Sequence, residues 1–135
     1  MAIQYSTTVR NAQLDALETA IGTAAVLKIR TGAPPANVGT ADSGTVLASM
    51  TLPSDWLAAA SGGSKAKSGT WQDASADATG TAAHFRIYAS DGTTAHIQGT
   101  VTATGGGGDL TLDNTSIASG QSVTISSFTL TAANS

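Results

Sequence analysis

The sequence predicts a mainly β fold: a jelly-roll-like sandwich or barrel of about seven or eight strands with one N-terminal α-helix. Short runs of alternating apolar and polar residues recur along the chain, separated by clusters of Gly, Pro, Asn, Asp and Ser. One stretch near the N-terminus, VRNAQLDALETAIG, spaces its apolar residues as an amphipathic helix does. The 135 residues contain no linker-like break, which predicts one domain over residues 1–135.

The N-terminal part is predicted to be an extended arm over residues 1–7 and a helix over residues 8–22, followed by the β-sandwich over residues 25–132. A Ser or Thr at positions 6–8 can cap the helix, and Gly22 can end it. We expect the helix to pack against the sheet. Its insertion into a groove of a partner is the alternative.

The strongest local signal is an Asp-Gly turn between two β-rich runs, HFRIYAS and TTAHIQGTVT, which predicts a hairpin. A three-residue loop with a left-handed Gly92 places Phe85 opposite Ile97 and Ile87 opposite Ala95, so that the apolar residues share one face. The opposite face is then expected to meet solvent. It carries His84, Arg86, Tyr88 and His96.

Further strands follow from the same alternation of residues. They are expected at residues 25–31, 45–52, 64–71, 109–113 and 121–132. Lys65 and Lys67 are expected on an exposed face, where they protect an edge strand from aggregation. Trp56 is expected to close one end of the core. A change of phase at Ser126 and Ser127 predicts a bulge, or a strand that moves from one sheet to another.

Composition limits the classes of function. The net charge is −3, and the six basic residues are scattered, which argues against a nucleic-acid partner. No apolar run is long enough to span a membrane, and the N-terminus does not have the pattern of a secretory signal. The chain has no Cys, and only 11% of its residues are charged. The neutral, Thr- and Ser-rich surface that this implies suits packing against other subunits.

The sequence offers no convergent site, and we expect no catalytic residue, no metal and no cofactor. His84 and His96 are expected beside the cation Arg86, which disfavours metal binding. Loop carboxylates can ligate calcium, but the ordered pattern of an EF-hand is absent. These carboxylates are Asp42, Asp109 and Asp113. The glycine run 105–108 lacks the helix that a phosphate-binding loop requires. A serine triad assembled in space around either histidine stays an open alternative.

Several stretches resemble one protein family over nearly the whole chain. The most specific are LKIRTGAPPAN, the segment leading into FRIYASDG, and TSIASGQSVTISS. They are similar to small virion proteins of tailed bacteriophages, of the capsid decoration (cement) type. The resemblance implies a β-rich fold, in some members a jelly-roll-like dimer or trimer, that binds the outside of an assembled shell of major capsid protein. It implies no catalytic residues.

We therefore expect a structural virion protein, not an enzyme, made in the host cytoplasm and located on the capsid surface. Its expected partners are the major capsid protein and further copies of itself in a homodimer or homotrimer, with no nucleic acid and no membrane. The expected interface residues are Ile3, Tyr5, Arg86, Tyr88 and His96, because Tyr and Arg are favoured at interface cores. The alternative is a tail or fibre component that binds a host glycan.

Overall fold

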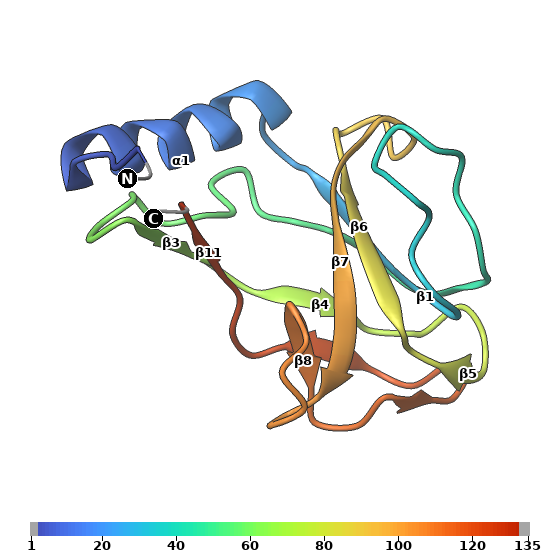
Figure 1. Ribbon diagram of the computed structural model, residues 1–135. Helices are drawn as coiled ribbons and strands as arrows, with labels where there is room; N and C mark the ends of the chain where they lie inside the picture. Colours follow the sequence, from blue (N-terminus) through green and yellow to red (C-terminus); the bar gives the residue numbers. More distant parts are fainter. Residues whose placement is uncertain (1–2, 133–135) are drawn as a thin grey trace.

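A computed structural model describes residues 3–132 of the chain, which contain one α-helix and eleven strands (Figure 1). In chain order the elements are α1 (Thr7–Ile21), β1 (Val26–Arg30), β2 (Val46–Thr51), β3 (Ser64–Ala66), β4 (Trp71–Asp73), β5 (Gly80–Thr81), β6 (His84–Tyr88), β7 (Ala95–Ala103), β8 (Leu110–Leu112), β9 (Ser116–Ile117), β10 (Val123–Ile125) and β11 (Thr129–Thr131). The predicted mainly β fold with an N-terminal helix is confirmed. The structure has more strands than the seven or eight predicted, because several strands have only two or three residues.

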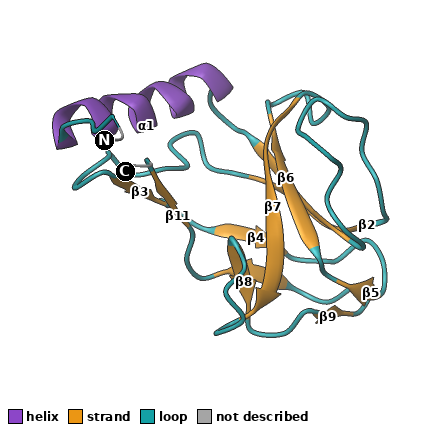
Figure 2. Cartoon of the chain, in the orientation of Figure 1, coloured by secondary structure: helices purple, strands orange, loops and turns teal. Residues whose placement is uncertain are grey.

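The strands form one curled sheet and three small sheets around a shared core (Figure 2). The larger sheet has the order β2-β1-β6-β7-β8. Its pairs are antiparallel except for β7 with β8, which is parallel. The small sheets pair β10 with β4, β11 with β3, and β5 with β9. This arrangement is that of a sandwich whose second layer is broken into short pieces.

The helix begins and ends where its capping residues place it. Ser6 has extended backbone and its side chain accepts a backbone N–H of the first turn, which would otherwise lack a partner. Gly22, with a φ of 93°, donates its N–H to the carbonyl of Glu18. Arg10 donates to the carbonyl oxygen of Ala132 at 3.0 and 3.2 Å. The start of the helix is therefore fastened to the end of the described chain, and Figure 1 shows these two segments near one another.

The core is organised around four aromatic rings in contact. The ring centroids of Trp56 and Trp71 lie 6.0 Å apart, those of Trp71 and Phe128 5.5 Å apart, and those of Phe128 and Phe85 5.6 Å apart. All four side chains are buried, so Trp56 is part of the core. Its indole N–H donates to the carbonyl of Gly22 at 3.0 Å, which ties the helix end to the core.

The predicted register of the hairpin was wrong by two residues, although its apolar face was placed correctly. Ile87 pairs with Ile97, and Phe85 pairs with Gly99. A shift of register next to Tyr88 then leaves an extra residue in β7. A slip of two residues preserves the faces of a strand, which explains why the apolar set still points to the core.

The hairpin turn explains the slip. Gly92 is left-handed, with a φ of 70°, as predicted. The carboxylate of Asp91 accepts the backbone N–H groups of Thr93 and Thr94, each at 2.9 Å. These bonds extend the loop, so that the Ala89 N–H reaches the carbonyl of Thr94 and pairing begins later in β7. The hydroxyl and backbone of Thr94 also hold the pKa of Asp91 well below its usual range.

The last strands behave as the phase change at Ser126 and Ser127 predicts. β10 pairs with β4, and β11, three residues further on, pairs with β3 in a different sheet. The side chain of Phe128, between them, is buried in the aromatic core. The prediction of a strand that moves from one sheet to another is confirmed.

The expected exposure of Lys65 was wrong. Its side chain is 2% exposed, and its ammonium lies 2.7 Å from Asp15 and 3.3 Å from Glu18. Helix α1 packs over β3 and brings both carboxylates to this lysine. Burial opposes the charge on Lys65, but the two carboxylates outweigh it and raise its pKa above the usual value.

Candidate interface surfaces

The five residues predicted to contact a partner fall into two groups in the structure. Ile3 and Tyr5 lie on the surface, with Ile3 76% exposed. His96 is also exposed. Arg86 and Tyr88 are buried, at 2% and 0% exposure, so neither can contact a partner directly. The predicted solvent-facing side of the hairpin was therefore wrong for two of its interface residues, and His84 is buried with them.

The physical reason is a loop that covers this face of the sheet. Residues 31–45, here called the covering loop, leave β1 and return to β2. Two hydrogen bonds close its ends: Thr31 N–H to the Thr45 carbonyl at 3.1 Å, and Thr45 N–H to the Thr31 hydroxyl at 2.9 Å. A compact loop with closed ends is an Ω-loop. Its composition, rich in Gly, Ala and Thr, gave no sign that it would pack on charged residues.

Asp42 of the covering loop is the centre of the buried polar cluster beneath it. One carboxylate oxygen accepts from the Arg30 guanidinium at 2.9 Å. The other accepts from Arg86 at 2.9 Å and from the Tyr88 hydroxyl at 2.7 Å. Partial burial opposes the ionised form of Asp42. The Tyr88 hydrogen bond and the two guanidinium groups outweigh it, so the pKa of this carboxyl is lowered.

Further hydrogen bonds fasten the covering loop to the sheet. Arg86 donates to the backbone carbonyl of Asn37 at 3.0 Å and to the side-chain oxygen of Gln98 at 2.9 and 3.1 Å. The Gln98 amide in turn donates to the carbonyl of Pro35 at 2.8 Å. Burial and the bond to Asp42 raise the pKa of Tyr88. An acid whose pKa is lowered between two arginines is ionised near neutral pH and is a weak base there, so we read this cluster as a structural clamp between loop and sheet.

The histidines do not converge on a common site. The Nδ1 of buried His84 donates to the carbonyl of Gly32 at 2.6 Å, and its Nε2 has no hydrogen-bond partner within the described chain. His96 lies on the outside of β7. Among residues 3–132, no three His, Asp or Glu side chains are grouped as metal ligands. Asp109, one of the loop acids considered for calcium, instead accepts from the backbone and hydroxyl of Thr100 at 2.9 and 3.2 Å.

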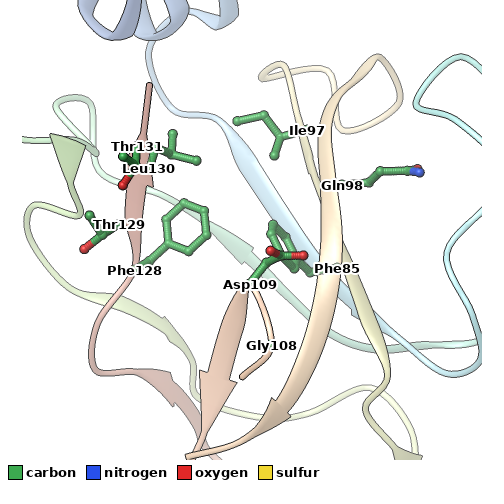
Figure 3. Close-up of a pocket in the computed structure, with 9 residues that line it drawn as sticks. All are labelled: Phe85, Ile97, Gln98, Gly108, Asp109, Phe128, Thr129, Leu130 and Thr131. Carbon is green, nitrogen blue, oxygen red and sulfur yellow. The ribbon is translucent and has the colours of Figure 1, made fainter. Parts of the chain in front are cut away.

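A groove that the sequence did not predict lies between β7 and β11 (Figure 3). Its volume is about 500 Å³. Figure 3 shows Ile97 on one wall, Leu130 on the other, and the rings of Phe85 and Phe128 between them. Asp109 stands at one end. The change of phase at Ser126 and Ser127 predicts that β11, which carries the Leu130 wall, leaves the sheet of β10. Nothing in the sequence predicts that β11 lies opposite β7.

Glycine is required at position 99 beside this groove. A Cβ at Gly99 would lie 2.8 Å from the ring of Phe85 and 2.8 Å from the carboxylate of Asp109. The missing side chain therefore lets Asp109 approach β7 and bond to the N–H of Thr100.

No known protein family, curated protein or solved structure matches the chain. The helix described within residues 3–132 is too short and too polar to cross a bilayer.

Proposed function

We propose that this chain is a structural protein of a tailed-bacteriophage virion that binds the outside of the assembled capsid. In this proposal it stabilises the shell by bridging neighbouring capsid subunits, acts as a homo-oligomer, and performs no chemistry. The origin of the proposal is the resemblance of LKIRTGAPPAN, FRIYASDG and TSIASGQSVTISS to capsid decoration proteins.

The observation that supports the proposal most is the exposed apolar surface formed by the N-terminal arm and the first turn of α1. Ile3, Tyr5 and Val9 are three of the four large hydrophobic side chains that are exposed within the described residues; Val38 is the fourth. Covering an exposed side chain of this size contributes roughly 1.5–3 kcal/mol. One arm gives a weak contact, but an oligomer that presents several arms to a repeating shell multiplies it.

The surface charge also fits a protein that packs against other subunits. Three of the six basic residues, Arg30, Lys65 and Arg86, are buried, which leaves a surface with little positive charge. Such a surface does not attract nucleic acid. It can instead pack against protein through Thr and Ser hydroxyls without desolvating charges.

The alternative function, glycan binding by a tail or fibre component, has less support. Sugars stack on exposed aromatic rings, and five of the six aromatic side chains in this chain are buried. The exposed one is Tyr5, in the arm. No aromatic platform is therefore present on the surface of the described residues.

The test is to prepare phage particles from a host in which this protein is not made. We expect these particles to assemble but to break at a lower temperature, or under milder chelator or osmotic stress. Adding the purified protein back should restore the resistance of the shell. Particles that are equally robust without the protein, together with its localisation to the tail tip, would refute the proposal and favour host recognition.

A further inference from the structure

β7 has an edge that is only partly paired. β8 pairs with it over Val101–Ala103, and the Asp109 carboxylate takes the N–H of Thr100 at 2.9 Å. From Ala95 to Gly99, β7 pairs with β6 on one side and with no strand of the described chain on the other. The N–H of Thr100 points away from β6. Backbone groups two residues apart in a strand point to the same side, so those of Gln98 also face the open edge.

The open edge borders the groove between β7 and β11. Ile97 and Leu130 are partly buried and pack against the core, so the groove presents apolar side chains beside unpaired backbone. The aromatic rings of Phe85 and Phe128 lie between these two walls (Figure 3). The groove is also lined by the polar side chains of Gln98, Asp109 and Thr129. Unpaired backbone next to a groove that offers some apolar side chains is the arrangement that binds an extended peptide by strand addition.

The arm of this same chain has the properties that such a groove requires. Ile3 and Tyr5 are two positions apart, so an extended arm presents both on one face. The arm carries no charged side chain, and Ser6 at its end already has extended backbone. Residues 3–6 span roughly 13 Å when extended, and the open edge of five residues spans roughly 17 Å.

The position of the arm also suits an exchange between copies. Arg10, in the first turns of α1, is bonded to Ala132, the residue that follows β11 in the groove wall. Within one chain, however, Ile3 is 76% exposed and the groove is open. The arm therefore does not occupy the groove of its own chain, which leaves the groove open to the arm of another copy.

We infer that the arm of one copy adds to the open edge of β7 in a second copy, with Ile3 against Ile97 and Leu130. The exchange is reciprocal, so both copies use the same surfaces, as in a two-fold dimer. The inference concerns contacts between copies of this chain, and it holds whether or not the chain is a capsid protein.

Disulfide trapping tests the contact directly, because the chain has no Cys of its own. An Ile3→Cys chain mixed with an Ile97→Cys chain should give a disulfide-linked heterodimer under mild oxidation. Val38→Cys, on another exposed apolar residue, replaces Ile3→Cys as the control and should give no more than background. The experiment is then repeated with Thr131→Cys in place of Ile97→Cys. Thr131 lies on the exposed groove wall, so this substitution leaves the core unchanged.

A chain with both Ile3→Cys and Ile97→Cys distinguishes exchange from closure within one molecule. Exchange gives linked dimers, whereas a linked single chain would overturn the inference. Light scattering of the unaltered protein should give twice the mass of 13.3 kDa. Ile3→Asp should raise the dimer dissociation constant about tenfold or more, and Val38→Asp should not. A mass of one chain at every concentration, or equal effects of the two variants, would overturn it.

Discussion

Replacing Asp42 with Asn should destabilise the fold strongly, even though Asp42 lies in a loop. Its carboxylate is the acidic partner of both Arg30 and Arg86 and also accepts from Tyr88. The two arginine side chains are 9% and 2% exposed. The amide that replaces the carboxylate is neutral and keeps a single acceptor oxygen, so the two buried guanidinium groups lose their counter-charge.

The magnitude follows from the bonds that are lost. A hydrogen bond to a charged group contributes roughly 1.5–3 kcal/mol, and breaking a buried ion pair costs roughly 3–5 kcal/mol. The Asp42 side chain is 35% exposed, so water replaces part of the loss. We therefore expect the free energy of unfolding to fall by about 2–4 kcal/mol.

Urea denaturation followed by tryptophan fluorescence measures this change, since Trp56 and Trp71 are buried in the core. With a slope of roughly 2 kcal/mol per molar urea, the middle of the usual range, the midpoint should fall by roughly 1–2 M. Asp55→Asn, at an exposed acid, is the matched control and should leave the midpoint nearly unchanged. Equal midpoints for the two variants would refute the view that the clamp holds the covering loop.

The dependence on pH gives a second measurement on the same pair of proteins. The pKa of Asp42 is lower in the folded protein than its ordinary value of 3.8. Its stabilisation is therefore present above about pH 4 and is lost as the pH falls through the folded pKa. The difference in melting temperature between the unaltered protein and Asp42→Asn should shrink between neutral pH and about pH 3.

Three other predictions concern the groove and the hairpin. Gly99→Ala should cost about 1–3 kcal/mol by overpacking against Phe85, whereas Gly39→Ala, in the covering loop, should be mild; similar midpoints in urea would contradict the crowding. Ile97→Asp should lower the midpoint more than His96→Asp, because Ile97 packs on the core; the reverse order would mean that the face assignment is wrong. EDTA should leave the melting temperature unchanged, and a fall of more than a few degrees would reveal a structural metal.

The parts of the fold that follow from local sequence were predictable. The helix, its Ser6 cap and its Gly22 terminus depend on residues within a few positions of one another. The left-handed Gly92 and the change of phase before β11 are also local signals. The register of β6 on β7 was not predictable, because it depends on the several hydrogen bonds that Asp91 accepts within the turn.

The candidate surfaces were harder to predict because they depend on what covers them. Alternation along β6 places Arg86 and Tyr88 on the polar face correctly, but burial of that face depends on the covering loop, whose sequence carries no apolar pattern. Asp42 is expected from the sequence only to be a loop carboxylate, and nothing in the sequence indicates that Arg30 and Arg86 surround it. The same limit applies to Lys65, whose partners are on a helix far away in the chain.

The pairing of the last strands has a consequence for how the chain folds during synthesis. β10 and β11 pair with β4 and β3, which lie near the middle of the chain. The side chain of Arg10 can form its hydrogen bonds only once the carbonyl of Ala132 is in place. The second layer therefore closes only after residues 123–132 have left the ribosome, and loops this long make closure slow. Until then β3 and β4 have unpaired edges, so a chain that stops before Val123 should accumulate as an open, aggregation-prone intermediate.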